Sequence, residues 1–186
     1  MAKNLITPGQ SLRRIMSREV APIYSFFGQD YYFQDLIVDG ISSVVFSDGG
    51  ERNNFIIGVD KEEDMLNSLN SNSLFSQKTI VIVKNSKKIK PKFQSEIIDY
   101  CNNPSSDKTL IFMFDDPYAT NKFIDSLSLL STCVDMRTPF PNKMREWAKY
   151  YSKKNNINLS DEILNQLLSL TRFDLMRRIY GDSHTF

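Results

Sequence analysis

Residues 71–85 read SNSLFSQKTIVIVKN, and this stretch decides the fold class of the chain. Residues 79–83 form a continuous β-branched run of strand length between polar neighbours. Such a run is typical of a strand that is buried on both faces of a parallel sheet. The sequence therefore predicts an α/β domain with this strand in its interior.

Leu74 and Phe75, just before that strand, are adjacent large apolar residues in a polar setting. Because adjacent side chains cannot both point inward from one face of a helix or strand, we expect at least one of them to be exposed. An exposed apolar residue on a loop next to a rigid strand can serve as an anchor for a pocket of another protein. The alternative is that both residues pack under the preceding helix and lead the chain into the strand.

Four further strands are predicted on either side of this stretch, and helical patterns separate them. Alternation of this kind predicts a mostly parallel sheet covered by helices. Asp30 and Asp60 are expected to cap two of the helices. We place this domain at residues 1–140, followed by an incomplete helical domain at 141–186. The other predicted strands are residues 23–27, 54–59, 109–114 and 132–136.

Composition limits the partners and the compartment. Lys plus Arg number 23 and Asp plus Glu number 22, so the net charge of +1 predicts no nucleic-acid or membrane partner, and any such contact must be local. No apolar run approaches the roughly 18 residues of a membrane span. Cys101 and Cys133 lie far apart among apolar neighbours, which indicates buried thiols in a reducing compartment. We therefore expect a cytoplasmic protein.

A lysine loop follows the central strand. A run of lysines can track the phosphates of DNA, but no stacking aromatic residues are interleaved with these. The alternative is a solvated loop. The lysine loop comprises Lys84, Lys87, Lys88, Lys90 and Lys92.

The loop after the first strand argues against a nucleotide site. A phosphate loop needs glycines together with a Lys and a Ser or Thr, and residues 27–33 read FGQDYYF. Asp30 also places a carboxylate at a helix N-terminus, where a phosphate should lie. Asp115 and Asp116 imitate the magnesium-holding end of a nucleotide-binding strand, but we interpret them as turn residues. His184 has neither metal-ligand spacing nor a nucleophile partner, and with no phosphate loop either, we expect no metal and no cofactor.

The order of these features resembles a known family. The opening IYSFFGQD at 23–30, then Leu74 and Phe75 ahead of the Val/Ile strand and basic loop, and later WAKYYSKKNNI at 147–157 with LSDE at 159–162, are similar to the delta subunit of bacterial DNA polymerase III. The similarity runs from about residue 20 to about residue 176.

The resemblance implies an AAA+-like fold with a degenerate nucleotide site. It also implies a clamp-loader subunit that binds and opens the sliding clamp (beta subunit) in DNA replication through an exposed Leu-Phe pair, here Leu74 and Phe75. Such a subunit has no chemistry of its own within the DNA-directed DNA polymerase holoenzyme. The family's C-terminal collar domain joins the other clamp-loader subunits. This chain ends before the collar and residues 178–186 depart from the expected charged helix, so we expect a truncated or frame-shifted fragment.

Two other functions remain open. One is an active P-loop ATPase of the clamp-loader class, which the loop after the first strand disfavours. The other is a DNA-binding module that uses the lysine loop and the basic helix after residue 141, and salt-dependent binding to primed DNA would favour it.

Overall fold

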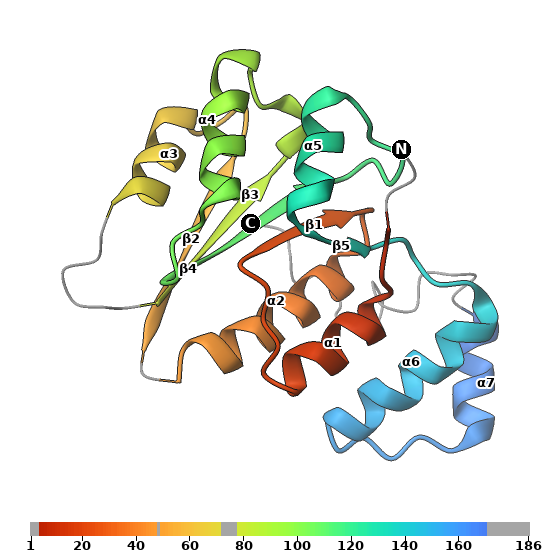
Figure 1. The fold of residues 1–186 in the computed structure, drawn as a ribbon. Helices are drawn as coiled ribbons and strands as arrows, with labels where there is room; N and C mark the ends of the chain where they lie inside the picture. Colours follow the sequence, from red (N-terminus) through yellow and green to blue (C-terminus); the bar gives the residue numbers. More distant parts are fainter. Residues whose placement is uncertain (1–3, 48, 72–77, 171–186) are drawn as a thin grey trace. The chain divides into compact units, whose positions relative to one another are not determined.

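The computed structural model describes residues 4–47, 49–71 and 78–170. The chain divides into two compact units, Met1–Arg137 and Thr138–Phe186. The proposed domain boundary at residue 140 stays a prediction. The first unit contains a parallel sheet of five strands in the order β2-β3-β4-β1-β5 (Figure 1). The strands are β1 (Ile23–Phe27), β2 (Gly50–Ile56), β3 (Lys78–Lys84), β4 (Lys108–Phe114) and β5 (Thr132–Asp135).

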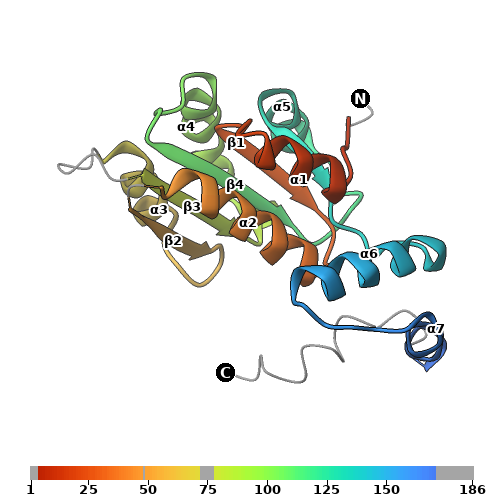
Figure 2. The same cartoon turned by 90° about the horizontal axis from the view of Figure 1, so that it is seen from below.

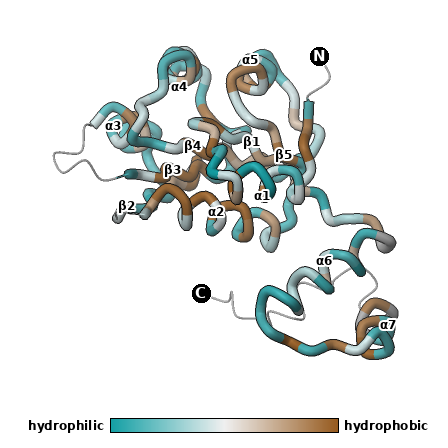
Figure 3. Tube along the Cα trace, turned by 60° about the horizontal axis from the view of Figure 1, so that its bottom comes forward, coloured by the Kyte–Doolittle hydropathy of each residue, from teal (hydrophilic) through white to brown (hydrophobic). Residues whose placement is uncertain are grey.

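Helices cover both faces of this sheet. Helices α1 and α2 lie against one face, and α3, α4 and α5 lie against the other (Figure 2). The hydropathy colouring shows α2 as a largely hydrophobic helix, whereas α1 is mostly hydrophilic (Figure 3). The helices are α1 (Pro8–Met16), α2 (Tyr31–Val45), α3 (Glu62–Asn70), α4 (Pro91–Asn102) and α5 (Lys122–Leu130), with a 3-10 turn η1 (Ser86–Lys88) after β3.

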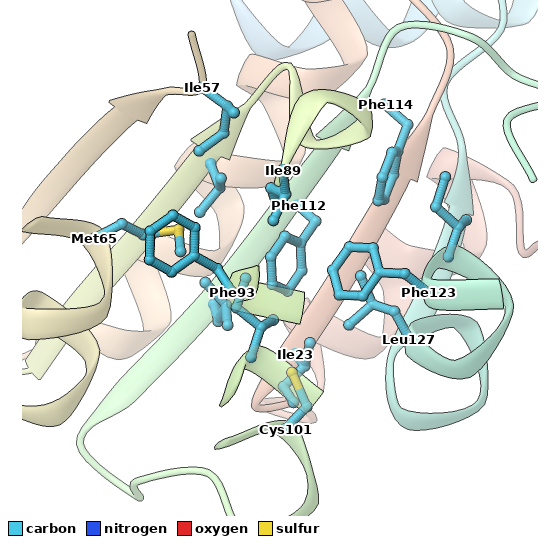
Figure 4. Close-up of a cluster of buried hydrophobic side chains, with 14 of the residues drawn as sticks. Ile23, Ile57, Met65, Ile89, Phe93, Cys101, Phe112, Phe114, Phe123 and Leu127 are labelled. Carbon is cyan, nitrogen blue, oxygen red and sulfur yellow. The ribbon is translucent and has the colours of Figure 1, made fainter. Parts of the chain in front are cut away.

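The core between the sheet and α3, α4 and α5 is built from large apolar side chains (Figure 4). Phe27 of β1 and Phe114 of β4 stack there with ring centroids 4.9 Å apart. Residues 79–83 of β3 are all buried, as the β-branched run predicted. Strand β3 lies between β2 and β4, so both of its edges are paired. The expected α/β fold with a parallel sheet is therefore confirmed.

Several local predictions hold. The carboxylate of Asp30 accepts a hydrogen bond from the backbone N–H of Phe33 at 3.3 Å, so Asp30 caps α2. Cys101 and Cys133 are both buried and free. Burial raises the pKa of the Cys101 thiol to about 12, which makes this thiol unreactive at neutral pH.

Two local predictions are wrong. Strand β2 begins and ends earlier than the predicted range 54–59, because it is the edge strand and its first residues are polar and largely exposed. Asp60 does not cap α3. Its carboxylate accepts the backbone N–H of Ile56 at 2.7 Å, which closes the turn after β2, and Lys61 occupies the N-cap position without a side-chain hydrogen bond.

The second unit contains two described helices, α6 (Pro141–Lys154) and α7 (Asp161–Leu170). Met144 and Ala148 of α6 pack against Leu164 of α7. Asp161 pairs with both Arg145 and Lys149 at 3.0 and 2.9 Å, and these cations lower the pKa of its carboxyl group. No helix within residues 4–47, 49–71 and 78–170 is long and apolar enough to cross a membrane.

Candidate functional site

The residues that the sequence singled out lie near opposite ends of the strands. Because all five strands are parallel, their carboxyl ends lie together at one end of the sheet and their amino ends lie together at the other. The lysine loop follows the carboxyl end of β3, whereas segment 72–77 precedes its amino end. Leu74 and Phe75 lie outside the described residues. The structure therefore places the two ends of their segment, Ser71 and Lys78, and leaves their own exposure a prediction.

The loop after β1 is closed by the chain that leaves β5. Met136 donates its N–H to the carbonyl oxygen of Phe27 at 2.7 Å and accepts the N–H of Asp30 at 3.0 Å. Gly28 lies between them with a φ of +128°. A Cβ at Gly28 would be 2.4 Å from the carbonyl carbon of Met136, so only glycine fits there.

The N-terminus of α2 is already occupied by groups of the same chain. The carboxylate of Asp30 caps this helix end, and Gln34 donates its side-chain N–H to the carbonyl oxygen of Gly28 at 2.9 Å. A phosphate would need the same helix end and would be repelled by the carboxylate. The geometry thus supports the interpretation of this loop as a degenerate nucleotide site.

Asp116 is a turn residue, as the sequence predicted. Its carboxylate accepts the N–H of Tyr118 at 2.9 Å, and its carbonyl oxygen accepts the N–H of Ala119 at 3.0 Å. The same carboxylate pairs with Lys87 at 3.0 Å. Among the described residues, no cluster of three or more His, Cys, Asp or Glu could hold a metal ion. His184 lies outside the described residues.

Three of the five lysines in the lysine loop are in ion pairs. Besides Lys87, Lys90 pairs with Glu62 at 3.1 Å and Lys92 pairs with Glu63 at 3.2 Å. Both glutamates belong to the first turn of α3. Each lysine lies about thirty positions from its glutamate in the sequence, and the fold brings the two together. The carboxylates neutralise much of the positive charge of the lysine loop.

Lys84 and Lys88 differ from the other three lysines. Across the described parts of the chain neither of them forms an ion pair, and both are exposed. A DNA phosphate could bind these two lysines without displacing a carboxylate. Contact between the lysine loop and DNA stays a prediction.

Glu62 is the most buried acidic side chain near the lysine loop, with 3% of the side chain exposed. Burial raises the pKa of its carboxyl group, but hydrogen bonds and the charge of Lys90 outweigh it and leave the pKa below its ordinary value. Its Oε1 is buried and has no hydrogen-bond partner among the described residues. Glu62 therefore depends on Lys90 for compensation of its charge.

A family sequence model described as "DNA polymerase III, delta subunit" matches residues 24–136. The chain belongs to this delta subunit family. The match extends from β1 through the end of β5, so it includes segment 72–77 and the lysine loop and ends before α6. No curated protein sequence matches the chain.

Solved structures show that this delta-family chain has an AAA+-like fold. The Bacillus subtilis DNA clamp loader delta protein superposes with a TM-score of 0.64 at 16% identity, over 87% of this chain and 51% of that one. Two variants of Thermotoga maritima RuvB superpose with TM-scores of 0.57 at 12% and 11% identity, over 90% and 88% of this chain and 55% of theirs. This chain thus spans about half the length of these structures.

Lys108, the first residue of β4, has a role in the structure that its sequence pattern did not reveal. Its side chain is buried and donates to backbone carbonyl oxygens at the end of α3. The signal was a lysine placed directly before the apolar run TLIFMF, because the first residue of a buried strand has little access to water.

Proposed function

We propose that this chain binds the sliding clamp and opens it during DNA replication, using Leu74 and Phe75 as the contact. In this proposal the protein is cytoplasmic, works beside other clamp-loader subunits and performs no chemistry of its own. The observation that carries it is the delta-family match over residues 24–136, because this range contains the Leu-Phe pair ahead of β3.

The sheet supports this use of segment 72–77. The segment is flanked by Ser71, the C-cap residue of α3, and by Lys78, the first residue of a strand whose interior is fully buried. A loop that is held at both ends by a rigid scaffold loses less conformational entropy when it binds a partner. Two apolar side chains on such a loop can serve as binding hot spots.

The structure does not favour an active P-loop ATPase. The closed loop at Gly28 and the Asp30 cap leave no free helix N-terminus for a phosphate, and no lysine lies in that loop. In the proposed function the energy of ATP therefore comes from partner subunits, and this chain supplies the contact with the clamp.

A clamp-binding measurement tests the proposal. The 186-residue chain would be captured on a sensor surface, and the sliding clamp of the same organism would be passed over it. We expect saturable binding that the double change Leu74→Ala/Phe75→Ala weakens at least tenfold, about 1.4 kcal/mol. Lys61→Ala, at the opposite end of α3, is the matched control and should leave binding unchanged. Normal clamp binding by a folded double variant would show that the contact lies elsewhere.

A further inference from the structure

Lys108 is held in a site that uses all of its donors. It is 7% exposed, and its Nζ donates hydrogen bonds to the carbonyl oxygens of Ser68 at 2.7 Å, Leu69 at 2.8 Å and Ser71. An ammonium group has three N–H donors and no acceptor, so these three carbonyls satisfy it completely. A lysine in the last turn of its own helix would be an ordinary cap, but Lys108 comes from a strand about forty residues further along the chain.

The carbonyls that Lys108 binds are those that a helix end leaves unpaired. The last four carbonyl groups of a helix have no partner within the helix, and α3 ends at Ser71 in an extended conformation (φ −70°, ψ 134°) instead of a glycine cap. A cation at this end also interacts favourably with the helix dipole. Desolvation lowers the pKa of Lys108, while Asp107 and Glu51 raise it. Burial is the largest of these influences and leaves the pKa of Lys108 below its ordinary value, and the three carbonyl oxygens at the end of α3 give the buried ammonium group its hydrogen-bond partners.

Lys78, the residue directly after segment 72–77, is held by the two residues that precede Lys108. Lys78 donates to the carbonyl oxygen of Ser106 and to the carboxylate of Asp107, both at 3.1 Å. The backbone N–H of Thr79 donates to the carbonyl oxygen of Asp107 at 2.9 Å. Residues 106–108 thus hold both Ser71, where the segment begins, and Lys78, where it ends.

We propose that Lys108 is a positioning residue for the clamp contact: it fixes the last turn of α3 and Ser71, the residue directly before the segment that carries Leu74 and Phe75. This inference rests on the proposed function. With the anchor in place, the segment meets the clamp with one end already ordered. Without it, the last turn of α3 frays and binding must also order that turn.

The experiment replaces Lys108 by methionine, which keeps the length of the side chain and removes its charge and donors. We expect Lys108→Met to weaken clamp binding about fivefold, because binding must then also order the last turn of α3. Lys84→Met is the matched control, because Lys84 is exposed at the opposite end of β3 and touches neither end of the segment. It should leave clamp binding unchanged.

Two further measurements separate positioning from a general loss of structure. In the Leu74→Ala/Phe75→Ala background, Lys108→Met should produce less than a twofold further change, because the side chains that it positions are gone. Amide hydrogen exchange should accelerate at least tenfold for the bonded N–H of Ser71 and stay unchanged in β3 and β4.

The outcomes distinguish this inference from the proposed function. Unchanged clamp affinity in folded Lys108→Met, while the double alanine variant loses binding, overturns the positioning role and leaves the proposed function intact. Full binding by the double alanine variant overturns the proposed function, and the exchange of Ser71 then decides whether Lys108 anchors α3. Should Lys108→Met fail to fold, Lys78→Met replaces it, because Lys78 is half exposed. Lys78→Met should weaken clamp binding about threefold, and unchanged binding overturns the inference.

Discussion

Gly28 lies directly against the backbone of Met136, and a Cβ at position 28 would be 2.4 Å from both the carbonyl carbon and the carbonyl oxygen of Met136. This contact joins the loop after β1 to the chain that leaves β5. In nucleotide-binding proteins of this fold class, the loop after the first strand is the phosphate loop. Here the backbone of Met136 packs against that loop. The contact between Gly28 and Met136 is therefore part of the packing of the domain.

Gly28→Ala should destabilise the domain by about 3 kcal/mol, because a side chain there meets backbone atoms and the φ of +128° is strained for any residue except glycine. Gly49→Ala is the matched control. Gly49 has a φ of +95°, but no atom of the described residues beyond its chain neighbours lies within 4 Å of its Cβ position, so its cost should be only about 1 kcal/mol. Urea unfolding of both variants measures the difference. Equal losses would mean that the Met136 contact contributes nothing beyond backbone strain.

ATP should bind this chain no more tightly than the millimolar range, roughly −4 kcal/mol, because the start of α2 is capped by a carboxylate and its loop carries no lysine. Isothermal titration calorimetry with magnesium and ATP measures this directly. A micromolar dissociation constant would revive the ATPase alternative.

Replacing Lys84 and Lys88 together by methionine should change the free energy of unfolding by less than about 0.5 kcal/mol and clamp affinity by less than about threefold. Both side chains are exposed and neither is in an ion pair within the described residues. The same variant tests DNA contact, with binding to primed DNA measured at several salt concentrations. A large loss of DNA affinity with a shallower salt dependence would favour the DNA-binding module.

Lys90→Met should destabilise the domain by about 1 kcal/mol at pH 7, because it leaves the buried Glu62 carboxylate without its cation, while the exposure of Lys90 limits the loss. The folded state lowers the pKa of Glu62 below its ordinary value of 4.5. The ionised pair therefore stabilises the fold above pH 4.5, and this contribution disappears as the pH falls through the lowered pKa.

Chemical unfolding of Lys90→Met and the original chain at pH 7 and at pH 3 checks this dependence. The two chains should differ at pH 7 and converge at acidic pH. Lys92→Met is the control, since its partner Glu63 is exposed and should give a smaller effect. A difference that persists undiminished at pH 3 would contradict the assignment to Glu62.

Phe75→Ala should weaken clamp binding more than Leu74→Ala, because the phenylalanine side chain presents the larger apolar area to a pocket. Together the pair should present roughly 150 Å² or more, which at about 25 cal/mol per Å² is on the order of 4 kcal/mol before ordering costs. Neither substitution should alter the melting temperature. Unfolding of the double variant by several kcal/mol would instead mean that the pair packs in the core.

The sequence alone predicted the elements whose signals are local. The β-branched run at residues 79–83 indicated a strand buried on both faces of the sheet, and the apolar run at 109–114 indicated the strand that is β4 in the structure. The carboxylate of Asp30 predicted a helix cap that the structure confirms. Each of these depends on side chains within a few residues of one another, so no knowledge of the tertiary fold was needed.

Predictions that depend on where a strand lies in the sheet were wrong. Strand β2 pairs on one side only, with β3, so its first residues can be polar. The hydrophobic pattern alone therefore placed the start of the strand four residues too late and its end three residues too late. Asp60 has the spacing of a helix cap, but it binds Ile56 because the chain must turn there after the edge strand.

The charge partners were decided by the tertiary structure alone. The sequence left two interpretations of the lysine loop, a run that tracks phosphates or a solvated loop, and it did not predict the ion pairs. Packing α3 beside α4 brings Glu62 and Glu63 to Lys90 and Lys92. Lys108 precedes the predicted strand 109–114 and was not predicted to have a role, and only the parallel pairing of β3 with β4 places it under the end of α3. A linear pattern records how residues alternate along one element, whereas these contacts depend on which elements the sheet order makes neighbours.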